Sequence, residues 1–126
     1  MEPTLTRAVA EGTIEQVREL IKGGANLAAT NKQGTTPLMW AAARGNLAIV
    51  MELLASGAQV NTTNNGGLTA LMLSSGGGYA AVTRVLIEAG AEIGKTATSG
   101  DTAFSRARDA RHTHIMQLLR NAGSQK

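Results

Sequence analysis

Residues 34–61 read GTTPLMWAAARGNLAIVMELLASGAQVN, and this stretch decides the fold. Apolar residues recur three and four positions apart in two segments separated at Gly45, as on the buried faces of two short helices. Thr36 can cap the first helix because its hydroxyl accepts a hydrogen bond from a free backbone amide, and Pro37 suits the first helical position. Gly57 stands where the second helix would end, since glycine adopts the left-handed cap conformation without a Cβ penalty. The stretch predicts a helix, a tight reversal, a second helix and a glycine stop.

This pattern recurs at a regular spacing along nearly the whole chain. Leu38 has counterparts at Leu71 and Phe104. A Gly-Ala pair follows the second helix of three copies, at residues 24–25, 57–58 and 90–91. Such self-similarity is the sequence signature of a repeat architecture. Residues 1–126 are therefore predicted to form a single domain of four repeats, at about 3–30, 31–63, 64–96 and 97–124.

The period of about 33 residues, the helix-opening Thr-Pro-Leu at residues 36–38 and the Gly-Ala after the second helix resemble the ankyrin repeat. The resemblance covers almost all of residues 4–124. It implies an all-α ankyrin-repeat solenoid of four helix-turn-helix repeats, and hence eight short antiparallel helices. It also implies β-turn or hairpin loops that project from one edge of the helix stack.

The composition narrows the class of protein. No cysteine is present, which excludes disulfides and thiolate metal sites. No apolar run reaches the roughly 18 residues of a membrane-spanning helix, and residues 1–12 lack the basic start and apolar stretch of a signal peptide. We therefore expect a soluble, cytoplasmic protein that is monomeric when alone.

The net charge of +3 arises in the last repeat. Residues 101–126 hold five Lys or Arg against two Asp, whereas residues 1–100 hold seven residues of each sign. A polar end cap is the simplest explanation, and a surface for an acidic partner is the alternative. Arg7 and Arg106 stand at the repeat position of Trp40, so both end repeats are polar where the middle is apolar. We expect that no further repeat follows at either end.

The sequence predicts no catalytic, cofactor-binding or metal site. His112 and His114 are two residues apart, whereas two ligands on one helix face need a spacing of three or four. His112 is expected to have a packing or surface role. The run Gly76-Gly77-Gly78 ends a helix, whereas a phosphate-binding loop lies between a strand and a helix start and carries Lys-Ser/Thr. The chain is therefore not expected to be an enzyme.

Two structural expectations concern the middle repeats. The first helix of repeat three runs into the glycines at 76–78, and each glycine costs a helix about 1 kcal/mol relative to alanine. This helix is therefore predicted to be short and the least stable, and the second helix of that repeat is predicted over 81–88. Trp40, together with Met39 and Met72, is expected to be core between repeats rather than an exposed binding anchor.

The resemblance implies that another protein binds to a concave face made by the turn tips and the first helices. In ankyrin-like proteins the contact positions are turn residues and the end of the first helix. In this sequence they are Glu11, Thr30, Lys32, Gln33, Thr35, Arg44, Asn65, Gly66, Leu68, Gly76, Gly77, Thr98, Ser99, Asp101 and Asp109. Because the row lacks aromatic anchors, we expect either a modest affinity or a partner that inserts its own aromatic side chains above Gly76 and Gly77. A bulky residue at Gly77 should then weaken binding and leave the fold intact.

The expected function is that of a protein–protein interaction module, an adaptor or a regulatory binder, which needs no cofactor. A self-associating structural or scaffold subunit of a larger assembly is the first alternative. Nucleic-acid contact through Arg106, Arg108 and Arg111 is a remote alternative, because the patch is small and poor in aromatic residues that could stack on bases.

Overall fold

The computed structural model describes residues 4–123, which form eight helices and no strand. The outermost residues of the predicted repeats, Pro3 and Ser124, and the basic residue Lys126 lie outside the described residues. The helices are α1 (Leu5–Glu11), α2 (Ile14–Lys22), α3 (Pro37–Arg44), α4 (Leu47–Ala55), α5 (Ala70–Gly77), α6 (Ala80–Glu88), α7 (Ala103–Asp109) and α8 (Thr113–Gly123).

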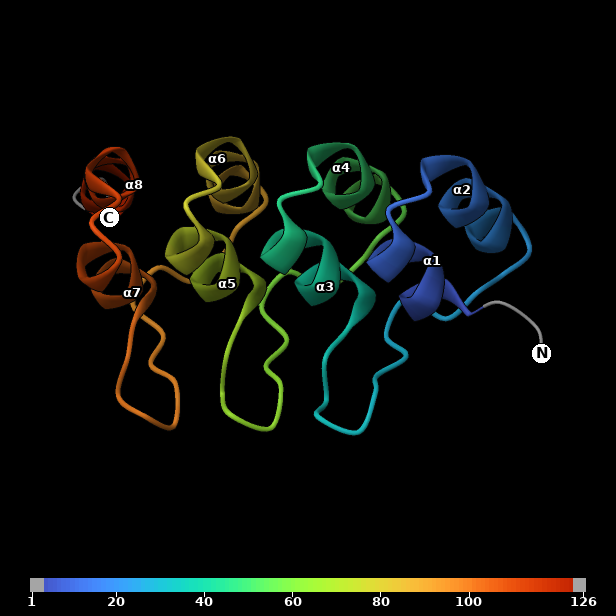
Figure 1. Cartoon of the computed structure of the whole chain (residues 1–126), viewed down its shortest axis with the longest axis horizontal. Coiled ribbons are helices and arrows are strands. Elements are labelled where there is room, and N and C mark those ends of the chain that lie inside the picture. The colour runs from blue at the N-terminus through green and yellow to red at the C-terminus, as the bar shows by residue number, and fades with distance from the viewer. Residues whose placement is uncertain (1–3, 124–126) are drawn as a thin grey trace.

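The helices form two rows (Figure 1). The first helices of the repeats, α1, α3, α5 and α7, lie side by side in one row, and α2, α4, α6 and α8 lie in the other. Each loop between two repeats leaves the second helix, extends past the row of first helices and returns to start the next one (Figure 1). The predicted all-α solenoid is confirmed.

A threonine begins the first helix of every repeat. Its Oγ1 accepts a hydrogen bond from the backbone N–H three residues ahead, which satisfies one of the amides left free at a helix start. The four threonines and their distances are Thr4 (3.1 Å), Thr36 (3.2 Å), Thr69 (3.2 Å) and Thr102 (3.0 Å). Pro37 occupies the first turn of α3, as predicted, and Gly57 has the left-handed φ of 99° just after α4.

The core runs the length of the stack because each repeat buries apolar side chains against the next. Leu38, Met39, Leu71 and Met72 are each only 1% exposed. Burying a side chain of this size stabilises the fold by roughly 1.5–3 kcal/mol. Trp40 differs from the prediction, because it is only half-buried and packs against the edge of this core.

Helix α5 corrects the expectation of a short helix. It has 8 residues, the same number as α3, and it includes Gly76 and Gly77. Neighbouring side chains lie over both glycines: a Cβ at Gly76 would stand 3.1 Å from Arg106 Nε, and a Cβ at Gly77 would stand 2.7 Å from Tyr79 Cε2. The helix therefore continues through residues whose missing side chains leave room for these contacts. Helix α6 begins at Ala80, one residue earlier than predicted.

The two arginines at the position of Trp40 do not have the same surroundings. Arg7 is exposed, and its Nε lies 3.3 Å from Glu11 Oε2. Arg106 is half-buried, and its Nε donates a hydrogen bond to the carbonyl oxygen of Met72 at 3.2 Å. Arg106 is thus a packing residue between repeats three and four, which its place in a polar end repeat did not predict.

Candidate functional site

Hydrogen bonds to an asparagine side chain stabilise two of the turns between repeats. In the second repeat Asn31 Oδ1 accepts hydrogen bonds from the backbone N–H groups of Gln33 at 2.9 Å and Thr35 at 3.0 Å. In the third repeat Asn64 Oδ1 accepts from Gly66 and Leu68 at the same two distances. An asparagine that bonds its own turn in this way holds the loop in one conformation.

Successive turns are also bonded to one another. The backbone N–H of Asn65 donates to Gln33 O at 2.8 Å, and Asn65 Nδ2 donates to Lys32 O at 3.0 Å. One repeat further on, the N–H of Thr98 donates to Gly66 O at 2.9 Å. The structure therefore brings these predicted turn positions together in one hydrogen-bonded row.

The other predicted positions lie at the ends of the first helices. Glu11, Arg44, Gly77 and Asp109 end α1, α3, α5 and α7. The predicted site residues that are exposed are Glu11, Thr30, Lys32, Gln33, Arg44, Asn65, Gly66, Gly77, Thr98, Ser99 and Asp109. Those that are half-buried are Thr35, Leu68, Gly76 and Asp101.

Two hollows meet at Trp40, and sequence reasoning missed both. One, of about 460 Å³, lies between α1 and the first turn and is lined by Thr4, Thr6, Arg7, Ala10, Ala29, Thr30, Asn31 and Trp40. The other, of about 180 Å³, lies against α3 and is lined by Thr35, Met39, Trp40, Ala43, Asn64 and Leu73. One feature of the sequence pointed to them. The equivalent position of the four repeats is apolar in the two middle repeats, at Trp40 and Leu73, and is arginine in the two end repeats, at residues 7 and 106.

A third hollow, of about 330 Å³, joins a turn to a helix end in repeat four. It is lined by Gly76, Asp101, Arg106, Asp109 and Ala110, so it unites three of the predicted positions. The side chains of Arg106 and Tyr79 lie where a Cβ on Gly76 or on Gly77 would point, so the open space in this region is beside Gly76 and not directly over the two glycines. That a partner inserts aromatic side chains near these glycines stays a prediction, and the adjoining hollow lined by Gly76 is the open space that such a side chain could enter.

A family model of ankyrin repeats, in three copies, matches residues 5–97. The chain belongs to the ankyrin-repeat family. Its α7 and α8 lie beyond the matched residues but repeat the same helix pair with the same threonine cap. No curated protein matched the sequence as a relative. Ankyrin repeats are generally protein–protein interaction modules and typically have no catalytic activity.

The three arginines considered for nucleic-acid contact do not form a free basic patch on this ankyrin-repeat chain. Arg106 is engaged with the carbonyl of Met72, and Arg108 Nε lies 3.3 Å from Asp109 Oδ1. Arg111 is exposed. Two of the three guanidinium groups thus already have partners within the domain.

The two histidines of the ankyrin-repeat domain have different surroundings. The ring of His112 lies over Gly78, where a Cβ would stand 2.7 Å from its Cε1, whereas His114 is exposed. Among residues 4–123, no three His, Cys, Asp or Glu side chains gather so that they could hold a metal ion. In the same range, no helix is both long and apolar enough to cross a membrane.

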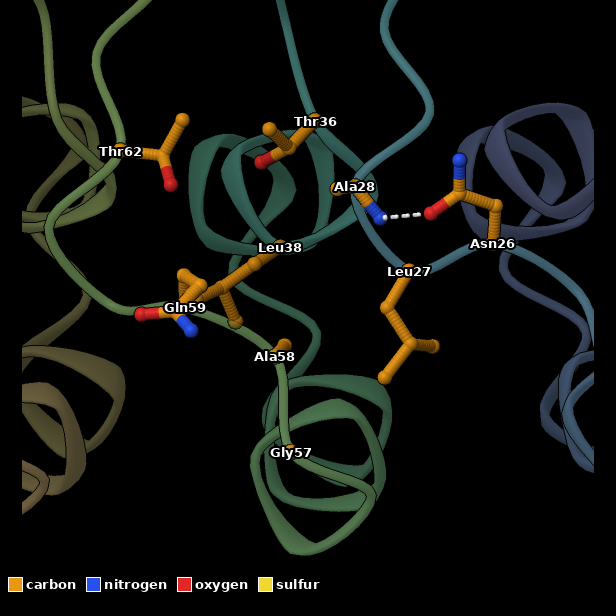
Figure 2. Close-up of a pocket in the computed structure, with 9 residues that line it drawn as sticks. All are labelled: Asn26, Leu27, Ala28, Thr36, Leu38, Gly57, Ala58, Gln59 and Thr62. Atoms are coloured by element: carbon orange, nitrogen blue, oxygen red, sulfur yellow. Dashed lines mark hydrogen bonds between the residues drawn. The ribbon is translucent and has the colours of Figure 1, made fainter.

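A fourth hollow, of about 220 Å³, lies away from Trp40, between the loops that follow α2 and α4 (Figure 2). Its lining residues are Asn26, Leu27, Ala28, Thr36, Leu38, Gly57, Ala58, Gln59 and Thr62, and none of these lines the other three hollows. Asn26 Oδ1 accepts a hydrogen bond from the N–H of Ala28 at 2.9 Å, which fixes one wall (Figure 2).

Proposed function

We propose that this ankyrin-repeat domain binds another protein through its inner face, meaning the turn tips together with the exposed sides of α1, α3, α5 and α7. The observation that carries the proposal is the pair of hollows on either side of Trp40. Tryptophan is enriched among the residues that anchor protein interfaces. The hydrogen-bonded row of turns supports the proposal, because a preformed surface loses little conformational freedom on binding.

The charge around Trp40 favours a partner segment that is partly acidic. Lys32 lies at the neighbouring turn and Arg44 lies one helical turn beyond Trp40 on α3. Among residues 4–123, neither cation has an ion-pair partner within the domain, whereas Arg7 is paired with Glu11. Carboxylates on the partner would complement these two groups and speed its association.

The proposal takes the domain to be an adaptor or a regulatory binder without catalytic activity. Its four repeats, at about 3–30, 31–63, 64–96 and 97–124, would act as one continuous surface. The cytoplasmic location and the monomeric state expected from the sequence are kept as part of the proposal. Light scattering after size-exclusion chromatography tests the monomer, because a stable dimer at low concentration would favour the self-associating scaffold instead.

Two matched substitutions test the inner face. Ala43 lines the smaller hollow at Trp40 and is exposed, so Ala43→Arg fills that hollow without disturbing the core. Ala48→Arg makes the same change at an exposed alanine of α4, in the other row of helices. In affinity capture from native cells, proteins retained by the wild type and by Ala48→Arg should be lost with Ala43→Arg. Equal capture by all three baits would overturn the proposal.

A further inference from the structure

The side chain of Asn61 shows how this fold holds a carboxamide. Its Nδ2 donates to the carbonyl oxygen of Gly90 at 3.2 Å, and its Oδ1 accepts from the backbone N–H of Glu92 at 2.8 Å. One amide group thus satisfies an acceptor and a donor in the loop that follows α6. Asn61 itself lies in the loop after α4, so both bonds join the loops of neighbouring repeats.

The backbone groups that bind the Asn61 carboxamide have equivalents one repeat earlier, where the chain supplies no carboxamide; this pair of backbone groups is called the amide seat below. Ala28 stands at the position of Asn61, and Gly57 and Gln59 stand at the positions of Gly90 and Glu92. The methyl group of Ala28 can neither donate nor accept a hydrogen bond. Within residues 4–123, no group donates to Gly57 O and none accepts from the N–H of Gln59.

These residues line the hollow of about 220 Å³ described above (Figure 2). The side chains of Leu27 and Leu38 form an apolar part of its wall. Gly57 and Gln59 also line it, and by their correspondence with Gly90 and Glu92 they offer one backbone acceptor, Gly57 O, and one backbone donor, the N–H of Gln59. A ligand for this hollow therefore needs a short apolar stem and a head that both donates and accepts.

We propose that the hollow between the loops after α2 and α4 is a binding site for a carboxamide group. The group donates through its NH₂ to Gly57 O and accepts through its oxygen from the N–H of Gln59, as Asn61 does one repeat later. A carboxylate has no proton to donate at neutral pH and so leaves Gly57 O unpaired. An aliphatic group makes neither bond and leaves Gly57 O and the N–H of Gln59, both in exposed residues, to water, so only the amide gains two hydrogen bonds to the protein.

Propionamide is a suitable probe, because it carries a carboxamide on a two-carbon stem. Titration followed by ¹H–¹⁵N correlation NMR should give a saturable shift of the Gln59 amide signal. A ligand of this size binds weakly, with a dissociation constant on the order of 10–100 mM. Propionate, which has the same shape but no amide donor, should cause no saturable shift at Gln59.

Two variants make the test specific. Ala28→Asn should occupy the seat from within the chain and abolish the propionamide shift at Gln59. Asn61→Ala should open the equivalent seat, so that propionamide produces a second saturable shift at the amide of Glu92. The second variant also shows that the assay detects a carboxamide where one is known to fit.

A terminally blocked asparagine distinguishes the two sources of the amide. If it shifts Gln59 as propionamide does, an Asn side chain on a partner fits the site. If only propionamide does so, the ligand is a small free amide. The absence of a saturable shift at Gln59 with either probe up to about 0.5 M, or an equal response to propionate, would overturn the proposal.

Discussion

The ring of Tyr79 lies over Gly45, so that a Cβ placed on this glycine would overlap ring atoms. The same ring lies over Gly77, and Tyr79 is nevertheless 36% exposed. Asn46 and His112 hold the corresponding position in repeats two and four, where they lie near Gly12 and over Gly78. Repeats two, three and four thus each place one side chain against the left-handed glycine that follows the first helix of the repeat before it.

This relationship predicts that Gly45→Ala is more costly than Gly12→Ala. Both glycines have left-handed φ values, 72° and 76°, so both substitutions strain the backbone by about 1 kcal/mol. A Cβ at Gly12 would stand 3.6 Å from its nearest neighbour, Asn46 Nδ2, whereas Gly45 lacks the space. Urea unfolding should show a loss of roughly 2–4 kcal/mol for Gly45→Ala. The difference between the two variants should vanish in a Tyr79→Ala background, and its persistence there would contradict this explanation.

Adjacent glycines in α5 are predicted to respond in opposite directions. Alanine favours a helix over glycine by about 1 kcal/mol. At Gly76 the new methyl would stand 3.1 Å from Arg106 Nε, a contact that a shift of a few tenths of an ångström in this side chain relieves, so Gly76→Ala should raise the melting temperature. At Gly77 it would meet the ring of Tyr79 at 2.7 Å, so Gly77→Ala should lower it. Thermal unfolding by circular dichroism decides, and a gain at both positions would mean that Tyr79 moves freely.

The core of repeat three contains a hydroxyl that the structure leaves unsatisfied. Ser75 is 0% exposed and its Oγ has no hydrogen-bond partner among the described residues. Ser75→Ala should therefore stabilise the domain by about 1 kcal/mol. Ser74, also buried, shares a 2.9 Å hydrogen bond with Thr83 Oγ1, so Ser74→Ala should not stabilise it. Equal gains in denaturant unfolding would show that the Ser74–Thr83 bond contributes nothing.

The indole of Trp40 carries a second unsatisfied donor, because its Nε1 is buried and finds no acceptor among residues 4–123. Trp40→Phe removes this unsatisfied N–H, which stabilises the fold, but it also buries less apolar side-chain area, which destabilises it. The two effects oppose each other, so the free energy of unfolding should change by less than about 1 kcal/mol. Trp40→Ala should cost about 2–4 kcal/mol. If Trp40→Phe costs as much as Trp40→Ala in urea unfolding, the indole N–H makes a stabilising hydrogen bond in solution.

The elements that local chemistry determines were predictable from the sequence. The cap at Thr36, the proline at the start of α3 and the glycine after α4 all follow from which backbone groups are free at a helix end. The repeat register then places every helix pair, because the same pattern of apolar residues and helix-end signals recurs from one repeat to the next.

Contacts between repeats were less predictable. Arg106 and Tyr79, which come from later in the chain, lie over the glycines with which α5 ends. Helix propensity treats Gly76 as a cost and carries no information about the side chain that needs the space. For the same reason the hollows at Trp40 were not predicted from the sequence, because their walls come from different repeats.

Trp40 is the only tryptophan of the chain, so its fluorescence reports directly on the inner face. The most direct test is to titrate a captured partner into the domain and record the Trp40 emission. A bound partner should exclude water from the indole and give a saturable blue shift of the emission. Ala48→Arg should leave the affinity unchanged, whereas Ala43→Arg should lower it at least about tenfold. Binding that leaves the Trp40 emission unchanged and is equally tight in both variants would contradict the inner face as the binding site.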